Sequence, residues 1–249
     1  MSQGTVLVAG AGGFIGGHLV RDLLGSSDRV VAVDCKPLDE WHQVFGETEN
    51  VVADLREKDV CYSVVEGAED IYNLASDMGG MGFIEANKAL CMLSVLINTN
   101  LLLAARDHGA QRFFFSSSAC VYSMLKQTSA DVTPLTESDA YPAVPEDGYG
   151  WEKLFSERMC RHFTEDFGIV TRVARYHNVY GTHGTFEGGR EKAPAAICRK
   201  VAEAKLSGGT EIEIWGDGEQ TRSFCYVDDC VEGIYRLMRS DHREPLNLG

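Results

Sequence analysis

A short glycine-rich turn constrains the fold of this chain more than any other stretch. Residues 5–9 (TVLVA) have the pattern of a buried strand, and Gly10, Gly13 and Gly16 follow directly, before a segment with helical periodicity. Glycines at this spacing permit a tight turn and a close approach of backbone to a pyrophosphate, which would lie at the N-terminus of the helix. The pattern therefore predicts a dinucleotide-binding strand–turn–helix unit.

A carboxylate at the end of the second expected strand, residues 29–33, supports that prediction. Asp34 can accept hydrogen bonds from both hydroxyls of a ribose and would repel a 2′-phosphate, which favours NAD over NADP. Lys36 lies close enough to leave that choice open. Asp54, after a third strand at residues 50–53, could hold the adenine amine.

The rest of the chain alternates between strand and helix patterns. Further strands are expected at 70–75, 112–116, 169–174, 211–215 and 245–249, and helices at 86–108, at 149–167, after Pro194 and at 227–238. This alternation predicts an α/β fold with a Rossmann-like, doubly wound parallel sheet. Residues 123–148 and 175–192 have the composition of polar surface loops.

Two regions are expected along the chain. We predict an NAD-binding Rossmann domain at residues 1–174, and substrate-binding loops and strands at 175–249 that are interleaved with the last Rossmann elements. The strand at 245–249 stops without the element that normally follows. We therefore expect a fragment that lacks part of a small C-terminal substrate-binding region.

Composition narrows the possible partners and the compartment. The net charge of −14 argues against a nucleic-acid or membrane-surface partner. We see no signal peptide and no apolar run of membrane-spanning length. The eight cysteines show no CxxC and no metal-like cluster with histidine, so no metal is expected. These features favour the reducing cytoplasm, with buried free thiols at Cys61, Cys91, Cys160 and Cys198.

A hydroxyl at a strand end and a Tyr-x-x-x-Lys motif indicate alcohol–ketone chemistry. Ser118 follows the strand that contains three phenylalanines, and Tyr149 and Lys153 lie one turn apart on the same helical face. A nearby ammonium favours the phenolate form of tyrosine. Cys120, two residues after Ser118, has no role in that chemistry.

These motifs resemble those of the extended short-chain dehydrogenase/reductases of the NAD-dependent epimerase/dehydratase family. Within that family, the chain resembles the GDP-mannose 3,5-epimerases. The distinctive segments are DMGGMGFI (77–84), SSAC (117–120), YGWEKL (149–154), HNVYG (177–181), GGREKAPAA (188–196) and WGDGEQTRSF (215–224). One departure is Ser123, where this family usually has proline, and we interpret it as a change in a loop.

The resemblance implies a mechanism. Tyr149 as phenolate would remove the C4 hydroxyl proton of GDP-D-mannose while NAD⁺ takes the hydride. Lys153 would lower the pKa of that tyrosine and bind the nicotinamide ribose, and Ser118 would hydrogen-bond the same substrate oxygen. The C4 ketone makes the C3 and C5 hydrogens acidic, so Cys120 as base and Lys192 as acid could invert those centres. Return of the hydride would give GDP-L-galactose or GDP-L-gulose.

The resemblance also implies two sets of binding residues. Cofactor contacts are expected at Gly10, Gly13, Phe14, Ile15, Gly16, Asp34, Asp54, Leu55, Leu74, Ala75, Tyr149 and Lys153. Substrate contacts are expected at Gly79, Ser118, Ala119, Cys120, Asn178, Glu191, Lys192, Ala193, Lys200, Gln220, Thr221 and Arg222. An arginine near a diphosphate is chemically sensible because its planar fork binds phosphate through two hydrogen bonds.

Other interpretations stay open on the residues alone. Cys120 fits equally well as a small packing residue, and Lys192 as a solvated loop lysine. A UDP-sugar 4-epimerase would share the Ser and Tyr/Lys motifs without needing a Cys/Lys pair, and a non-catalytic NAD-binding regulator would need none of them. A 4,6-dehydratase would need an Asp-Glu pair where Ala119 and Cys120 stand.

Oligomeric state has two alternatives. The helices at 86–108 and 149–167 have faces that could pair across a two-fold axis as a four-helix bundle, which predicts a homodimer. The same faces could instead be buried against the sheet of their own chain.

Overall fold

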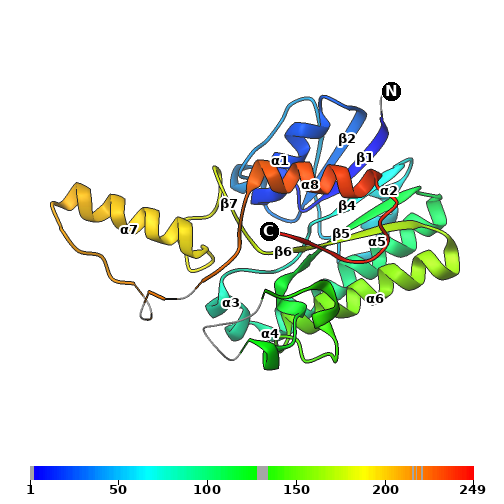
Figure 1. The fold of residues 1–249 in the computed structure, drawn as a ribbon. Helices are drawn as coiled ribbons and strands as arrows, with labels where there is room; N and C mark the ends of the chain where they lie inside the picture. Colours follow the sequence, from blue (N-terminus) through cyan, green and yellow to red (C-terminus); the bar gives the residue numbers. More distant parts are fainter. Residues whose placement is uncertain (1–2, 128–133, 215, 217, 220) are drawn as a thin grey trace.

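Seven parallel strands form the central sheet of the computed structural model, which describes residues 3–127, 134–214, 216, 218, 219 and 221–249 (Figure 1). The strand order is β3-β2-β1-β4-β5-β6-β9. The strands are β1 (Gln3–Ala9), β2 (Ser27–Asp34), β3 (Glu49–Val52), β4 (Asp70–Asn73), β5 (Arg112–Ser118), β6 (Val170–Tyr176) and β9 (Leu246–Leu248). The predicted doubly wound fold is confirmed.

Helices cover both faces of the sheet. The helices are α1 (Phe14–Leu23), α2 (Lys58–Val65), α3 (Met81–Ala86), α4 (Lys88–Met92), α5 (Ser94–His108), α6 (Tyr149–Phe167), α7 (Ala193–Ser207) and α8 (Val227–Arg239). Short 3₁₀ turns lie at Leu38–Glu40, Ala119–Val121, Met124–Lys126 and Glu137–Ala140. Successive side chains of β1 show the layering: Val6 and Val8 pack with α1 and α8, whereas Leu7 and Ala9 pack with α2 and α5.

Helix α6 has the bounds that the sequence predicted. It begins at Tyr149 and ends at Phe167, where Gly168 adopts the left-handed conformation with φ of 79°. A glycine accepts this conformation without the steric cost that a Cβ would bring. The start of α6 therefore presents Tyr149 at the end of the sheet where β5 also finishes.

The helix expected at 86–108 is present from Lys88 to His108, and the structure adds one interruption within it. Asn87 separates α3 from α4, with φ of −130° outside the helical region, and its side-chain amide donates to the Phe83 carbonyl. Leu93 separates α4 from α5. A side-chain hydrogen bond from asparagine to a nearby backbone carbonyl competes with helix continuation in this way.

The sequence was expected to contain no apolar run of membrane-spanning length. The stretch Lys88–His108 is nevertheless long and apolar enough to cross a membrane. The core helix of a soluble protein can have the same length and composition. Its residues Leu101, Leu102, Ala104 and Ala105 are buried in the cluster that also contains sheet and α2 residues. One side of the segment therefore packs in the core.

The prediction of a strand at 211–215 is wrong for residues 211–214, which the structure describes. Residues 211–214 have no strand geometry and are mostly exposed. Trp215 lies outside the described residues. A strand needs a hydrogen-bonded neighbour, and among the described residues the second sheet contains β7 (Asn178–Tyr180) and β8 (Phe224–Tyr226).

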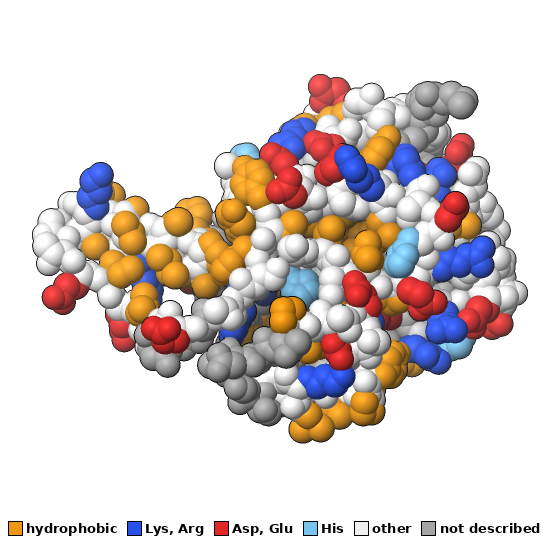
Figure 2. Space-filling model, in the orientation of Figure 1, with side chains coloured by type: hydrophobic (Ala, Val, Ile, Leu, Met, Phe, Trp, Pro, Cys, Tyr) orange, Lys and Arg blue, Asp and Glu red, His pale blue; other side chains and the backbone are white. Residues whose placement is uncertain are grey.

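Helix α7 projects from the body as an arm (Figure 1). It begins one residue before Pro194, as the proline predicted, but none of its described residues is buried. Cys198 on this helix is exposed, which corrects the expectation of a buried thiol, while Cys61, Cys91 and Cys160 are buried free thiols as expected. Figure 2 shows hydrophobic side chains gathered along the arm, and Ile197, Val201 and Leu206 are among the exposed apolar residues.

Candidate active site

A cleft of about 2440 Å³ lies over the carboxyl ends of the central strands. The glycine turn, the ends of β2, β4 and β5, the start of α6 and the start of α7 all contribute to its lining. Open α/β sheets bind ligands at this edge. The volume exceeds the range of about 300–1,000 Å³ typical of a single small-molecule site, so a dinucleotide and a second ligand fit together.

The glycine turn leaves no room for side chains. Gly10 has φ of +82°, and a Cβ there would come within 2.8 Å of the Ala75 amide nitrogen. A Cβ on Gly16 would lie 2.1 Å from the Gly10 carbonyl oxygen. Because both contacts are with backbone, neither can yield easily, and the turn can only pass close to its neighbours with glycine at these positions.

The N-terminus of α1 is suited to a pyrophosphate. Gly13 is its N-cap residue, with no side-chain cap and no acidic residue in the first turn. The first amide groups of the helix therefore lack a side-chain acceptor at the lining of the cleft, where an anion can accept from them. Phe14 and Ile15 also line the cleft.

Asp34 and Asp54 stand at the ribose and adenine end. Asp34 is 8% exposed, and its carboxylate accepts from the Lys36 amide at 3.1 Å. The Lys36 ammonium donates to the Gly12 carbonyl at 2.9 Å, so it is engaged by the glycine turn. Hydrogen bonds from Arg56 lower the pKa of Asp54 and occupy its carboxylate. With Leu55, Leu74 and Ala75 these residues line the cleft and fit an NAD-type cofactor.

Ser118 and Tyr149 meet where β5 and α6 face each other. Tyr149 is 4% exposed, and hydrogen bonds with Ser118 and Ser76 act on its phenol. Lys153 is 1% exposed and lies behind the tyrosine, with Nζ 5.4 Å from the centroid of the Tyr149 ring. Nζ is also 4.7 Å from the Phe115 ring centroid and 3.7 Å from Glu152 Oε2. Strand and helix thus bring the predicted triad together.

The expected phenolate is not the favoured form of Tyr149 in this structure. Burial raises its pKa well above the ordinary value, and the charges of Cys120 and Glu152 raise it further. The hydrogen bonds from Ser118 and Ser76 act in the opposite direction and do not outweigh them. The prediction considered the ammonium alone and overlooked desolvation, which here is the larger effect.

Cys120 and Lys192 face the same cleft from two different elements. Cys120 lies in the 3₁₀ turn after β5, with its amide donating to Ser118 Oγ at 3.2 Å. Lys192 is the N-cap residue of α7, and its ammonium donates to the Gly79 carbonyl at 3.4 Å. Burial raises the pKa of Cys120 and lowers that of Lys192, while the charge of each opposes the shift of the other. The pair is therefore electrostatically coupled.

Most of the other expected substrate contacts also lie around this cleft. Its lining includes Ala119, Asn178, Glu191, Ala193, Thr221 and Arg222. Gly79 contributes its carbonyl to Lys192, as described above. Lys200 instead donates to the Glu213 carbonyl at 2.7 Å and is not among the lining residues. Gln220 lies outside the described residues.

Two acidic residues near the site were missed from the sequence. Glu146 lines the cleft, accepts from the Gly150 amide at 2.9 Å and raises the pKa of Cys120. Its place just before a helix start was the available signal. Glu157 binds Arg175 through two hydrogen bonds of 2.9 and 2.7 Å and accepts from Ser117 Oγ. It lies one turn after Lys153, on the face that the Tyr-x-x-x-Lys motif already identified.

Comparison with known proteins agrees with this geometry. Residues 6–249 match the model of the NAD dependent epimerase/dehydratase family. Curated relatives include GDP-mannose 3,5-epimerase 1 of Oryza sativa subsp. japonica, 49% identical, and GDP-mannose 3,5-epimerase of Arabidopsis thaliana, 47% identical. Each alignment covers 98% of this chain and 64% of the relative, so the chain spans less than two thirds of their length.

Solved structures give the same result. UDP-glucose 4-epimerase of Thermotoga maritima with UDP-glucose superposes with a TM-score of 0.84 at 25% identity, covering 98% of this chain and 76% of that one. MoeE5 in complex with UDP-glucuronic acid and NAD gives a TM-score of 0.75 at 27% identity, covering 98% and 75%. From the family match and these likenesses it follows that the chain belongs to the NAD dependent epimerase/dehydratase family.

Proposed function

We propose that this protein is an NAD-dependent isomerase that converts GDP-D-mannose to GDP-L-galactose and GDP-L-gulose. The observation that carries the proposal is the presence of Cys120 and Lys192 in the cleft that also contains Ser118 and Tyr149. A 4-epimerase needs the hydroxyl and phenol but has no use for a second acid–base pair. The 47–49% identity to proteins named GDP-mannose 3,5-epimerase supports the same choice.

The phenol and the serine would act at C4 of the sugar. Ser118 and Tyr149 would both hydrogen-bond the C4 oxygen, and the phenol oxygen would take and return the hydroxyl proton. When bound, NAD supplies a hydride acceptor at C4 and a positively charged ring. A positive charge beside Tyr149 would oppose the burial that raises its pKa, so proton removal becomes easier when the cleft is filled.

Cys120 and Lys192 would act at the carbons next to C4. Once C4 is a ketone, its neighbours C3 and C5 lose a proton readily. Cys120 would accept that proton as thiolate, and Lys192 would deliver one from the opposite face, which inverts the centre. Burial lowers the pKa of Lys192, which makes the ammonium a better proton donor near neutral pH.

The proposal predicts isotope exchange that a 4-epimerase would not show. Incubation of the purified protein with GDP-mannose in deuterated water should place deuterium at C3 and C5, which NMR resolves separately. Exchange at one carbon only would indicate inversion of a single centre. Exchange at neither carbon, together with inversion of UDP-glucose at C4, would refute the proposal in favour of a UDP-sugar 4-epimerase.

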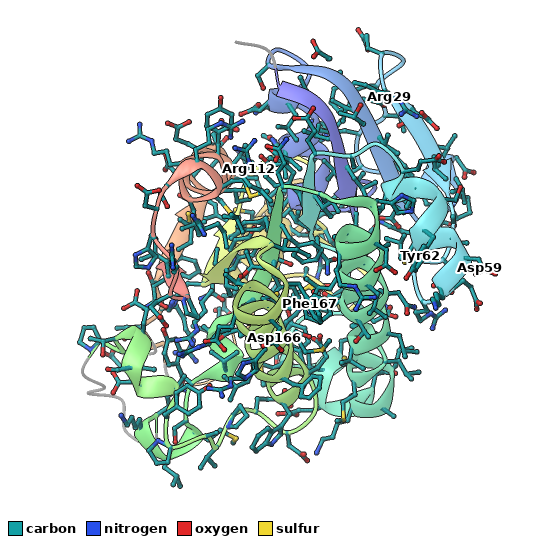
Figure 3. The ribbon with its side chains drawn as sticks, turned by 90° about the vertical axis from the view of Figure 1, so that its right-hand side faces the viewer. Arg29, Asp59, Tyr62, Arg112, Asp166 and Phe167 are labelled. Atoms are coloured by element: carbon teal, nitrogen blue, oxygen red, sulfur yellow. The ribbon has the colours of Figure 1, made fainter. Side chains whose placement is uncertain are left out.

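We propose in addition that the protein is a homodimer paired through α4, α5 and α6. Figure 3 views the face on which α5 and α6 lie, with Asp166 and Phe167 marking the end of α6. Met92, Leu93, Leu96, Trp151 and Phe155 are large apolar residues of this region that are 41–55% exposed. An exposed group of this kind supports burial against a second copy.

Light scattering tests the dimer directly. A dimer mass that falls to the monomer mass in Phe155→Glu supports the four-helix arrangement. A monomer mass in the unaltered protein would refute it.

We further propose a cytoplasmic location, which the eight free cysteines support, since reducing compartments keep thiols unpaired.

A further inference from the structure

Arg190 joins the segment that leads into α7 to the segment around α3. Its guanidinium carbon lies 3.9 Å from the centroid of the Phe83 ring, and Nη1 donates to the Met78 carbonyl at 3.2 Å. Two residues further along the chain, the Lys192 ammonium donates to the Gly79 carbonyl. A cation over an aromatic face and a charged donor on a carbonyl are both attractive contacts.

The small residues of the α3 segment allow this close approach. A Cβ on Gly79 would lie 2.8 Å from Cβ of Phe83, so the ring is pressed against the residue whose carbonyl holds Lys192. A Cβ on Gly80 would lie 3.2 Å from the Glu191 carbonyl oxygen. The contacts of Arg190 and Lys192 therefore lie next to each other on the α3 segment, with Phe83 packed against Gly79.

The arm offers little else to fix Lys192. None of the described residues of α7 is buried. Arg199 donates to the Phe186 carbonyl and pairs with Glu191 at 3.6 Å, but both contacts lie within the arm and its own loop. Earlier in the loop that leads into α7, the Thr182 carbonyl accepts from His18 at 2.9 Å, and the His183 ring contacts the His18 ring. Arg190 is much closer to Lys192 in the chain.

We propose that Arg190 and Phe83 are positioning residues that hold Lys192 opposite Cys120. The inference rests on the proposed acid–base roles of that pair. Neither residue would touch the reacting carbons. Their stack sets where the ammonium lies, and a displacement of about 1 Å in a reacting group can cost about a hundredfold in rate.

The test separates the proton-transfer step from the hydride step. In Phe83→Leu and Arg190→Lys, deuterium exchange at C3 and C5 of GDP-mannose should fall by about ten- to a hundredfold. NAD binding and the reduction of bound NAD, followed by absorbance, should stay within about twofold, since C4 chemistry does not use Lys192. Phe83→Tyr keeps the ring and should keep the exchange. The double variant should be no slower than the slower single variant, because either change alone releases the stack.

A matched control comes from a stack near the edge of the sheet where β5 and β6 begin, opposite the cleft. Arg106 lies 5.0 Å from the Phe167 ring centroid, near the C-terminal ends of α5 and α6, so Arg106→Lys should leave exchange unchanged.

Exchange at the unaltered rate in both test variants would overturn the proposal. So would an equal loss of exchange and NAD reduction, or a raised KM confined to Arg190→Lys, which would assign the guanidinium to a substrate phosphate. If the unaltered protein exchanges at neither carbon, the proposed function fails first, and this inference fails with it.

Discussion

Replacing Glu157 by glutamine should destabilise the fold strongly. Glu157 and Arg175 form an ion pair whose side chains are 3% and 2% exposed, joined by two hydrogen bonds. Glutamine keeps the shape but leaves the guanidinium as a buried charge, whose other described acceptors are the Glu137 carbonyl at 2.7 Å and the Tyr122 hydroxyl at 3.3 Å. Removing one partner of a buried pair typically costs about 3–5 kcal/mol, and we expect a loss of unfolding free energy in that range.

Urea denaturation of the two proteins measures the difference. The midpoint should fall while the slope of unfolding free energy against urea concentration stays the same, since the folded surface is unchanged. The double variant Glu157→Leu with Arg175→Met removes both charges and should recover most of the loss, because well-packed apolar replacements of a buried pair are often neutral. A loss below about 1 kcal/mol in Glu157→Gln, or a double variant as unstable as the single one, would refute the reasoning.

Three further predictions concern the site. Alkylation of Cys120 by iodoacetamide, followed by peptide mass spectrometry, should rise with pH to a midpoint above that of a free thiol, because burial raises its pKa and the thiolate is the reactive form. In Lys192→Met that midpoint should move higher still, since the ammonium that lowers the pKa is gone; an unchanged or lower midpoint contradicts the coupling. Gly16→Ala should weaken NAD binding at least about tenfold in calorimetry, because its Cβ would meet the Gly10 carbonyl, and unchanged affinity would argue against the turn as the pyrophosphate site. Cys120→Ala should lose C3 and C5 exchange by about a hundredfold or more yet still reduce bound NAD, and full exchange would remove the thiol from the chemistry.

Local patterns were sufficient for much of this protein. The buried strand before Gly10, the carboxylate of Asp34 at the end of β2, and the span of α6 from Tyr149 to Phe167 all match the structure. Each depends on neighbours in sequence: a short continuous apolar run, a glycine that ends a helix, and an i, i+4 pair on one helical face. Such features form wherever the surrounding chain is compatible, so a sequence displays them directly.

Other features depend on what packs where, and only the tertiary structure decided them. Among the described residues no strand pairs with residues 211–214, and Cys198 is exposed on α7, which projects from the body. Burial raises the pKa of Tyr149 and keeps it protonated, and the Tyr-x-x-x-Lys motif gives no information on that burial. The Glu157–Arg175 pair and the Arg190–Phe83 stack join segments that are distant in sequence. Long-range contact and burial, which set charge states and positions in this site, are properties of the folded chain and not of any single segment.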